Sequence, residues 1–441
     1  AMQPVIPQDE FLQRRERVLS RMPQNTVAIV SGHSELTRSN DTEYPFRQNS
    51  YFHYLTGFNE PDAVLVLSKI EGQPRSLLFC QNKDPEAEVW HGLRLGFHNA
   101  VHALAVDEGR DIDSFEDDVS ELLNGASSVL VLMGEDSVLE AQVRDAIDFL
   151  RANERKGYVA PHRIEDLRPT LDAMRQFKST QELAVMREAA RISSDAFKRI
   201  MKFCKPGAME YQLEAELQHE FAMQGAPAPA YGIICGGGAN ACILHYTDNR
   251  DVLHDGDLVL VDAGAEYQGY AADITRTFPV NGRFSEEQAM IYNIVLKAQQ
   301  AAFAHIKPGD TLKAATEAAA KVINDELTLL EILSGDAEEN FANNRWKKFF
   351  IHGLGHWLGL DVHDVGRYKS TDGEPLTFQP GMVLTVEPGI YISRESGVDE
   401  RWRGIGVRIE DDLIVTEDGF ENMTQAVPKT IEEIESWMQN K

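Results

Sequence analysis

The amino-acid sequence predicts a mixed α/β (α+β) protein with two domains. Its 441 residues are too many for one ordinary hydrophobic core, and 43% hydrophobic with 26% charged residues is a globular composition. Short apolar strands alternate with amphipathic helices along most of the chain. A segment rich in proline and charge ends near residue 175, so we expect domains over residues 1–175 and 176–441.

The N-terminal domain is predicted to contain a mixed sheet. Residues 9–22 have the apolar spacing of a helix. Runs typical of strands follow at 26–31, 63–68, 76–79 and 127–133. Residues 37–61 are rich in Asn, Ser, Pro and aromatic side chains, which argues against regular structure throughout. We interpret this segment as a loop whose polar and aromatic side chains make contacts.

The C-terminal domain is predicted to begin with two helices. Ser179 and Glu182 form a capping-box pattern, and Lys205-Pro206-Gly207 ends the periodic run. Leu213, Leu217 and Phe221 give the second helix one apolar face. The glycines at 236–238 lack the sequence context of a phosphate-binding loop, so we expect a flexible loop that shapes a pocket wall.

The most informative stretch runs from Leu258 to Phe278, because it places two acids within apolar strands. With a two-residue turn at Tyr267-Gln268, Asp262 would lie directly opposite Asp273. Directly opposed side chains have Cβ atoms roughly 4.5–5.5 Å apart, where like charges destabilise a sheet unless a cation lies between them. The alternative is an exposed hairpin tip with two solvated acids.

A second strand pair repeats this pattern. The segment Gly381–Gly389 matches Gly256–Gly264 and aligns Glu387 with Asp262. Residues 407–415 then read as one further strand, with Arg408, Glu410 and Asp412 on one face. We therefore expect two related halves, each with inward carboxylates. Chance similarity of apolar strands and an exposed edge strand remain alternatives.

Three histidines, His352, His356 and His363, lie between the halves. His352 and His356 have the spacing of a zinc-protease helix, but the motif lacks its glutamate and contains helix-breaking glycines. One metal-ligating histidine with the others facing substrate fits better, and His245 is a further candidate. Four carboxylates and one imidazole would balance two divalent cations, most readily Mn²⁺ or Co²⁺, with Zn²⁺ possible. These residues are Asp262, Asp273, His356, Glu387 and Glu410.

Overall charge excludes some partner classes. A net charge of −27 argues against nucleic acid and anionic membranes as partners. The N-terminal stretch has no apolar signal region, and no run of about 18 apolar residues occurs. The four cysteines form no CxxC pair, which is typical of free thiols. We expect a cytoplasmic protein.

The motifs together resemble the aminopeptidase P family of proline-specific metallopeptidases, which have a pita-bread catalytic fold. The resemblance rests on LVLVDAGAEYQGYAADITRTFPV, HGLGHWLGLDVHD, GMVLTVEPGIYI and RGIGVRIEDD, in that order. The stretch TRSNDTEYPFRQNSYFHYLTGFNEP is similar to the family's creatinase/prolidase-like N-terminal domain. The resemblance covers nearly the whole chain. It implies a catalytic domain with pseudo-twofold related halves and an N-terminal domain that serves substrate access and oligomerisation.

The resemblance also implies a role for each candidate residue. Asp262 would ligate one metal ion, Asp273 and Glu410 both ions, and His356 with Glu387 the other. Glu387 would also shuttle a proton, His363 would stabilise the tetrahedral intermediate, and His245 and His352 would line the substrate pocket. Arg408 and Tyr391 would contact these residues without touching the metal ions. Weaker candidates for substrate contacts are Trp90, Asp41 and Arg367, some of them from a neighbouring subunit of a homotetramer, although ordinary packing or surface charge explains them equally well.

The implied activity is removal of the N-terminal residue from peptides with proline in second position, through a hydroxide shared by two metal ions. Two alternatives remain open. An Xaa-Pro dipeptidase (prolidase) would cleave only the dipeptide, and a non-catalytic binding protein on the same fold would have lost its metal. The intact set of five ligands argues against the second alternative.

Overall fold

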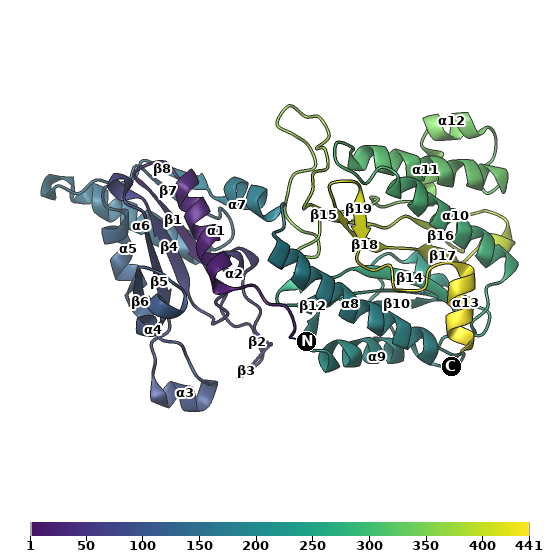
Figure 1. Cartoon of the computed structure of the whole chain (residues 1–441), viewed down its shortest axis with the longest axis horizontal. Helices are drawn as coiled ribbons and strands as arrows, with labels where there is room; N and C mark the ends of the chain where they lie inside the picture. Colours follow the sequence, from purple (N-terminus) through teal and green to yellow (C-terminus); the bar gives the residue numbers. More distant parts are fainter. Residues whose placement is uncertain (1, 441) are drawn as a thin grey trace. The chain divides into compact units, whose positions relative to one another are not determined.

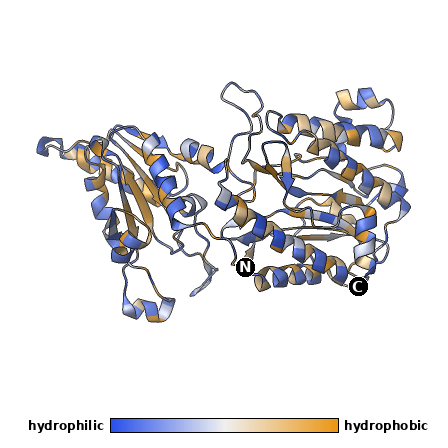
Figure 2. Cartoon of the chain, viewed as in Figure 1, coloured by the Kyte–Doolittle hydropathy of each residue, from blue (hydrophilic) through white to orange (hydrophobic). Residues whose placement is uncertain are grey.

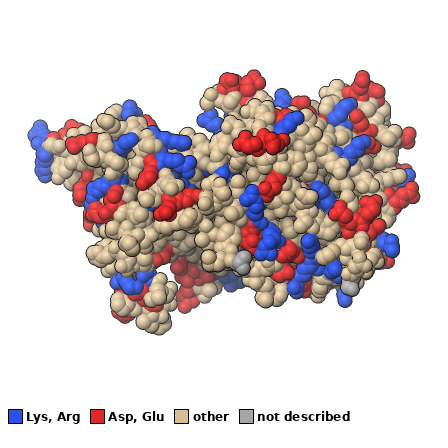
Figure 3. All heavy atoms as spheres, viewed as in Figure 1, with Lys and Arg blue, Asp and Glu red and all other residues tan. Residues whose placement is uncertain are grey.

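The computed structural model describes residues 2–440, which fold into two compact units. Residues 6–174 form the smaller unit, and residues 2–5 with 175–440 form the larger one. In both units the strands carry mostly apolar residues, whereas the helices carry polar residues on one side (Figure 2). The face drawn in Figure 3 shows Lys and Arg side chains interrupted by acidic ones. On that face, positive charge forms no continuous surface for a polyanion.

A six-stranded mixed sheet organises the smaller unit, with the order β6-β5-β4-β1-β7-β8. Its strands are β1 (Thr26–Ser31), β4 (Val64–Ser68), β5 (Arg75–Cys80), β6 (Glu108–Asp111), β7 (Ser128–Val131) and β8 (Arg163–Asp166). β1 pairs antiparallel with β4 and parallel with β7. The four strands predicted from the sequence correspond to β1, β4, β5 and β7, and the predicted helix to α1 (Gln8–Arg21).

Helices cover both faces of this sheet (Figure 1). Alternate residues such as Val27, Ile29 and Val129 pack against α5 (Phe115–Leu123) and α6 (Ser137–Ala152). The remaining elements are α2 (Ser50–Thr56), α3 (Pro85–His91), α4 (Phe97–Ala103), α7 (Arg168–Arg175), η1 (Ile70–Gly72), η2 (Ile112–Ser114), η3 (Glu154–Lys156), β2 (Thr37–Ser39) and β3 (Thr42–Glu43). The segment predicted as a loop thus contains only the short elements β2, β3 and α2.

The larger unit consists of two halves with the same order of elements, helix pair and then strands (Figure 1). The helices are α8 (Thr180–Phe203) and α9 (Glu210–Met223) in the first half, and α10 (Glu286–Phe303) and α11 (Leu312–Leu329) in the second. The capping box predicted at Ser179 and Glu182 is present, and Ser285 with Gln288 forms another. Both close the free N–H groups of a helix start.

Each half contributes a three-stranded antiparallel sheet. The first contains β10 (Ile234–Gly237), β11 (Leu258–Ala263) and β14 (Ile274–Pro279), and the second β15 (Val383–Val386), β18 (Asp411–Val415) and β19 (Phe420–Asn422). Smaller elements complete the unit: β9 (Ala228–Pro229), β12 (Ala265–Tyr267), β13 (Tyr270–Ala271), β16 (Gly389–Ile392), β17 (Ile405–Arg408), α12 (Ala337–Ala342), α13 (Ile431–Gln439), η4 (Gly238–Cys242), η5 (Arg345–Lys348) and η6 (Glu400–Trp402).

The halves meet at Thr275 and Glu410, which pair as an isolated antiparallel bridge. Thr275 N donates to Glu410 O at 3.3 Å, and Glu410 N donates to Thr275 O at 3.0 Å. Asp262 lies opposite Thr275 in the first half. Because Val386 lies opposite Asp411, extending that register by one residue sets Glu387 opposite Glu410. The pair Asp262 and Thr275 in the first half thus corresponds to Glu387 and Glu410 in the second, and the two pairs meet at the Thr275–Glu410 bridge.

Three local expectations are corrected. The hairpin turns at Gln268-Gly269, which puts Asp262 opposite Thr275 instead of Asp273. A tight hairpin turn of this kind needs positive φ at both central residues, and Gln268 (52°) and Gly269 (85°) supply it. The register shift is two residues, so the two acids still lie on the same face.

The second correction concerns residues 407–415, which do not form one strand. β17 ends at Arg408 and pairs with β16, whereas β18 starts at Asp411 and pairs with β15. The chain changes sheets at Ile409-Glu410, where Glu410 pairs with Thr275 of the other half. The third correction is at Gly236 and Gly237, which lie in β10 against β11 rather than in a flexible loop. A Cβ at Gly236 would lie 3.0 Å from the Asn240 carbonyl, so glycine allows η4 to pack closely.

Candidate metal centre and active site

Four side chains converge where strands of both halves end. Asp273, His356, Glu387 and Glu410 each offer one ligand atom, and these atoms lie within 4.8 Å of one another. His356 Nε2 is 3.2 Å from Asp273 Oδ2 and 3.6 Å from Glu387 Oε2. Asp273 and Glu410 directly precede β14 and β18, and Glu387 directly follows β15. His356 is held beside β15 by a backbone bond from Thr385 N to its carbonyl.

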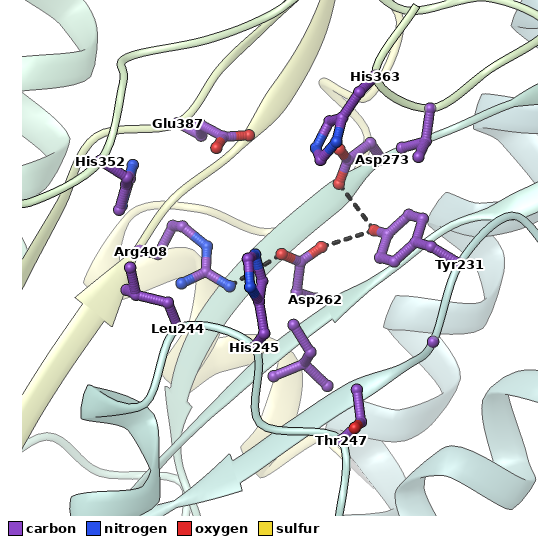
Figure 4. A pocket seen from close by; sticks show the side chains of 13 residues that line it. Tyr231, Leu244, His245, Thr247, Asp262, Asp273, His352, His363, Glu387 and Arg408 are labelled. Carbon is purple, nitrogen blue, oxygen red and sulfur yellow. Dashed lines mark hydrogen bonds and ion pairs between the residues drawn. The ribbon is translucent and has the colours of Figure 1, made fainter. Parts of the chain in front are cut away.

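Asp262 lies beside this cluster and is connected to it through Tyr231. The Tyr231 hydroxyl is 2.6 Å from Asp262 Oδ1 and 2.7 Å from Asp273 Oδ1 (Figure 4). Arg408 Nη2 donates to the other oxygen of Asp262 at 2.8 Å. All five predicted ligands therefore lie in one connected group, four of them within direct reach of a common ion.

The protonation of these acids reflects their crowding. Burial, and next the charge of Asp273, raise the pKa of Asp262 to about 7. Burial, and next Asp273 and Glu387, raise the pKa of Glu410 well above its usual range. Burial alone would lower the pKa of His356, but the close ion-pair contacts with Asp273 and Glu387 outweigh it and raise the pKa to about 11. In the absence of other cations, the group retains protons to relieve its negative charge.

Buried atoms without partners test whether divalent cations fit this group. His356 Nε2 and Glu410 Oε2 are buried and lack a hydrogen-bond partner within residues 2–440. The other nitrogen of His356, Nδ1, donates to the Trp357 carbonyl at 2.8 Å, so once Nε2 loses its proton its lone pair can serve a ligand. Thr275 Oγ1 donates to the remaining Glu410 oxygen at 2.7 Å. Oxygen donors with one imidazole and oriented supporting bonds fit divalent cations well.

A cavity of about 320 Å³ opens beside the cluster. His245 lines it from the loop after η4, and His352 and His363 line it from the long connection between η5 and β15; Figure 4 shows these side chains around Asp262 and Glu387. The His363 ring stands edge-on to His356 with ring centroids 4.4 Å apart. The apolar part of the wall is Ile234, Leu244 and Val362. Acids and imidazoles thus line the same cavity.

Arg408, Tyr391 and His352 form a relay behind Asp262. Arg408 Nη1 donates to the Tyr391 hydroxyl at 3.0 Å, and that hydroxyl lies 2.6 Å from His352 Nε2. Since His352 Nδ1 faces the Gly353 carbonyl at 2.8 Å, the imidazole carries its proton there and accepts from Tyr391. Burial lowers the pKa of His352, which agrees with a neutral ring.

The weaker candidates lie elsewhere. Trp90 is 80% exposed on α3, and Asp41 is exposed in the turn between β2 and β3, both in the smaller unit. Arg367 is exposed in the larger unit and does not line the cavity. Only its backbone carbonyl is used there, as acceptor for Trp357 Nε1 and Gln176 Nε2.

Sequence reasoning missed the roles of three residues of the centre. These are Tyr231, Thr275 and Asp412, the last as a hydrogen-bond acceptor. Tyr231 stands alone before β10 and has no spacing signal. Thr275 was detectable, because it lies two residues after Asp273 on the same strand face. Asp412 was assigned to the Glu410 face, and its carboxylate accepts from Asp273 N at 3.0 Å across the two halves.

A buried centre of four carboxylates and one imidazole beside a peptide-sized cavity defines a metal-dependent hydrolase. Comparison with known families makes this specific. Residues 184–417 match the model of metallopeptidase family M24, and residues 11–131 match the aminopeptidase P N-terminal domain. The chain belongs to metallopeptidase family M24.

Similar proteins match over the full length. The Xaa-Pro aminopeptidase of Escherichia coli K12 is 46% identical, with 98% of each chain covered. The structure of proline aminopeptidase P II from Yersinia pestis has a TM-score of 0.96 at 47% identity and covers 99% of this chain and 100% of that one. A Zn-substituted E. coli aminopeptidase P in complex with product also has a TM-score of 0.96, at 46% identity and 98% coverage of both chains. Among the described residues, no helix is long and apolar enough to cross a membrane.

Proposed function

We propose that two divalent ions bound by Asp262, Asp273, His356, Glu387 and Glu410 serve the reaction of this chain, a metal-dependent Xaa-Pro aminopeptidase. It hydrolyses the bond between an N-terminal residue and a proline in second position. The observation that carries the proposal is the cluster of ligand atoms within 4.8 Å, together with the orphaned His356 Nε2 and Glu410 Oε2. Full-length similarity to Xaa-Pro aminopeptidases supports the substrate class.

The ligand set divides between two positions. Asp262, which lies on the Arg408 and Tyr231 side, would hold one ion, and His356 with Glu387 the other. Asp273 and Glu410 lie between them and would serve both. When bound, the ions would polarise the scissile carbonyl and lower the pKa of water.

Glu387 is the proton carrier in this proposal. Burial would raise its pKa, but contacts with Glu410 and His356 outweigh burial and hold the pKa below its usual range, so the side chain is an ionised carboxylate. It takes a proton from the attacking water as the new C–O bond forms. It then gives this proton to the proline nitrogen, because an amide nitrogen leaves only as a protonated amine. The C–N bond breaks, and the first residue is released as a free amino acid.

The imidazoles act on the substrate. Burial, and next the neighbouring His356, lower the pKa of His363, so the ring is neutral and still carries one N–H. That N–H would donate to the carbonyl oxygen as negative charge develops on it. His245 and His352 would contact the peptide from the opposite loops of the cavity, and Arg408 with Tyr391 would hold Asp262 and His352 in place.

The finer assignments are also proposals. Oxygen-rich ligation favours Mn²⁺. The exposed apolar side chains Val89 (83%), Trp90 (80%) and Leu93 (87%) would be covered by a neighbouring subunit in a homotetramer, which would bring Trp90 and Asp41, with Arg367, to the substrate. Four free cysteines, three of them buried, support a cytoplasmic location. The smaller unit would then serve substrate access and assembly.

A peptide assay tests the activity. The metal-free protein is given Mn²⁺ and one of three substrates: Xaa-Pro-Xaa, the dipeptide Xaa-Pro, or Xaa-Ala-Xaa. We expect release of the first residue from Xaa-Pro-Xaa and little from Xaa-Ala-Xaa. Cleavage of the dipeptide alone would identify a prolidase, and failure to bind Mn²⁺ would favour a non-catalytic binding protein.

A further inference from the structure

His245 has no anchor of its own. Its side chain is exposed in the cavity wall, and no hydrogen bond to another residue of the range 2–440 restrains the ring. It belongs to the His245 loop, residues 237–251, which starts at the last residue of β10 and otherwise contains only the short η4 as regular structure. The position of the imidazole therefore depends on whatever fixes the backbone of this loop.

One buried carboxylate outside the cavity accepts hydrogen bonds from several residues of this loop. Glu210, at the start of α9, is fully buried and accepts four hydrogen bonds. The donors are Gly237 N at 2.7 Å, Asn240 Nδ2 at 3.1 Å, Tyr246 Oη at 2.6 Å and Asp251 N at 2.9 Å. All four donors belong to the His245 loop, and one of them is the residue next to His245.

The four donors fill the acceptor positions of the Glu210 carboxylate. A carboxylate offers about four lone-pair positions, and each of these four donors takes one. Among the described residues, no Lys, Arg or His side chain forms an ion pair with Glu210, so the loop donors alone offset the burial of its charge. Burial, and next Glu210, raise the pKa of Tyr246, which keeps its hydroxyl a donor.

A separate anchor holds the end of the loop. Asn249 has a φ of 51° and bonds the edge of β10 twice, from Cys235 N to its Oδ1 and from its Nδ2 to the Ile233 carbonyl, both at 2.9 Å. Removing the Tyr246 bond therefore leaves the loop attached at Asn249. We expect the segment around His245, which lies between the two anchors, to become more mobile.

We propose that Glu210 is a positioning residue that fixes His245 against the substrate through the hydroxyl of Tyr246. The inference rests on the proposed contact of His245 with substrate and adds the group that sets its place. Glu210 touches no reacting atom and no metal ligand. Its effect on catalysis is exerted only through the loop.

The test is a double-mutant cycle with Tyr246→Phe and His245→Ala, measured as kcat/KM on an Xaa-Pro-Xaa peptide with saturating Mn²⁺. Tyr246→Phe keeps the ring and removes only the hydroxyl. Losing a hydrogen bond to a charged group predicts a fall in kcat/KM of about tenfold in the wild-type background. In the His245→Ala background we expect no further fall, because the positioned group is gone. Glu210→Gln, which turns an NH₂ group toward two donors, should follow the same pattern with a larger effect.

Tyr292→Phe is the matched control. Its hydroxyl donates to the Lys429 carbonyl in a buried site that does not line the cavity, so its loss should leave kcat/KM unchanged. Bound Mn²⁺ should stay the same in all variants.

Additive losses in the double variant would show a general structural role and overturn the inference, as would unchanged activity of Tyr246→Phe. Unchanged activity of His245→Ala would instead refute the proposed contact of His245 with substrate. The two failures are therefore distinguishable.

Discussion

Thr275 and Glu410 face each other at the junction of the two halves, joined by two backbone bonds and by a side-chain bond of 2.7 Å from Thr275 Oγ1 to Glu410 Oε1. Glu410 is fully buried, and its other oxygen has no hydrogen-bond partner among residues 2–440. Each half thus supplies what the other lacks: a hydroxyl from the first orients a carboxylate of the second. The free oxygen is directed at the cluster of acids.

Thr275→Val should therefore weaken metal binding without unfolding the protein. Valine has nearly the same shape, but it leaves Glu410 Oε1 without its donor. Loss of a bond that orients a metal ligand costs about tenfold or more in metal affinity. Calorimetric titration of the metal-free protein with Mn²⁺ measures this change.

Thr316→Val serves as control for this substitution. The Thr316 hydroxyl bonds the Leu312 carbonyl within α11 and does not line the cavity. Equal Mn²⁺ affinities for wild type, Thr275→Val and Thr316→Val would show that Thr275 does not orient a ligand.

Asp364 predicts an acid-sensitive contribution to stability. It follows His363 directly and is buried between Arg175 Nη2 at 2.8 Å and Lys178 Nζ at 2.9 Å. Burial alone would raise its pKa, but Lys178 and Arg175 outweigh burial and hold the pKa below its usual range. Asp364→Asn leaves Lys178 buried without its acid and removes one of the acids beside Arg175, which keeps Asp361 at 3.2 Å; the loss costs about 3 kcal/mol at pH 7.

The sign of the pH dependence follows from the lowered pKa. The unfolded carboxyl titrates near pH ~3.9, and the folded one at lower pH. The stabilisation by Asp364 is therefore complete above the unfolded pKa and is lost as pH falls through the folded pKa. Calorimetric melting of wild type and Asp364→Asn should show a large stability difference at pH 7 that shrinks below about pH 4. A difference that stays constant or grows on acidification would exclude this ion pair as its source.

The turn at Gln268-Gly269 gives a test of the backbone conformation at Gln268. Gln268 has a φ of 52°, a conformation that asparagine adopts at lower cost. Gln268→Asn should stabilise the larger unit by about 0.5 kcal/mol, as a small rise in melting temperature. A fall in melting temperature would count against a left-handed backbone at Gln268.

Much of the fold was readable from local patterns. The capping box at Ser179 located a helix start, and apolar runs located β1, β4, β5 and β7. The errors came from interactions across the chain. Residues 407–415 look like one strand, but Glu410 is drawn to Thr275 of the other half and the strand divides there. The hairpin register depended on which two residues form the turn, and the expected turn at Tyr267-Gln268 left out Gly269, although glycine adopts positive φ most readily.

The candidate centre was readable because its chemistry is unusual. Acids in apolar strands and three histidines within twelve residues stand out in any sequence, and the structure brings Asp273, His356, Glu387 and Glu410 together. The supporting residues do not stand out. Tyr231 and Glu210 are ordinary residue types, and their roles come from contacts made far along the chain.

The central claim is that one two-metal centre drives Xaa-Pro cleavage. The most direct measurement is the rate of release of the first residue from Xaa-Pro-Xaa as metal-free protein is titrated with Mn²⁺, with bound metal counted in parallel. We predict two ions per chain, full activity only when the centre is loaded, and loss of both activity and one or both ions in Asp273→Ala. Full activity of Asp273→Ala with unchanged metal content would contradict the account.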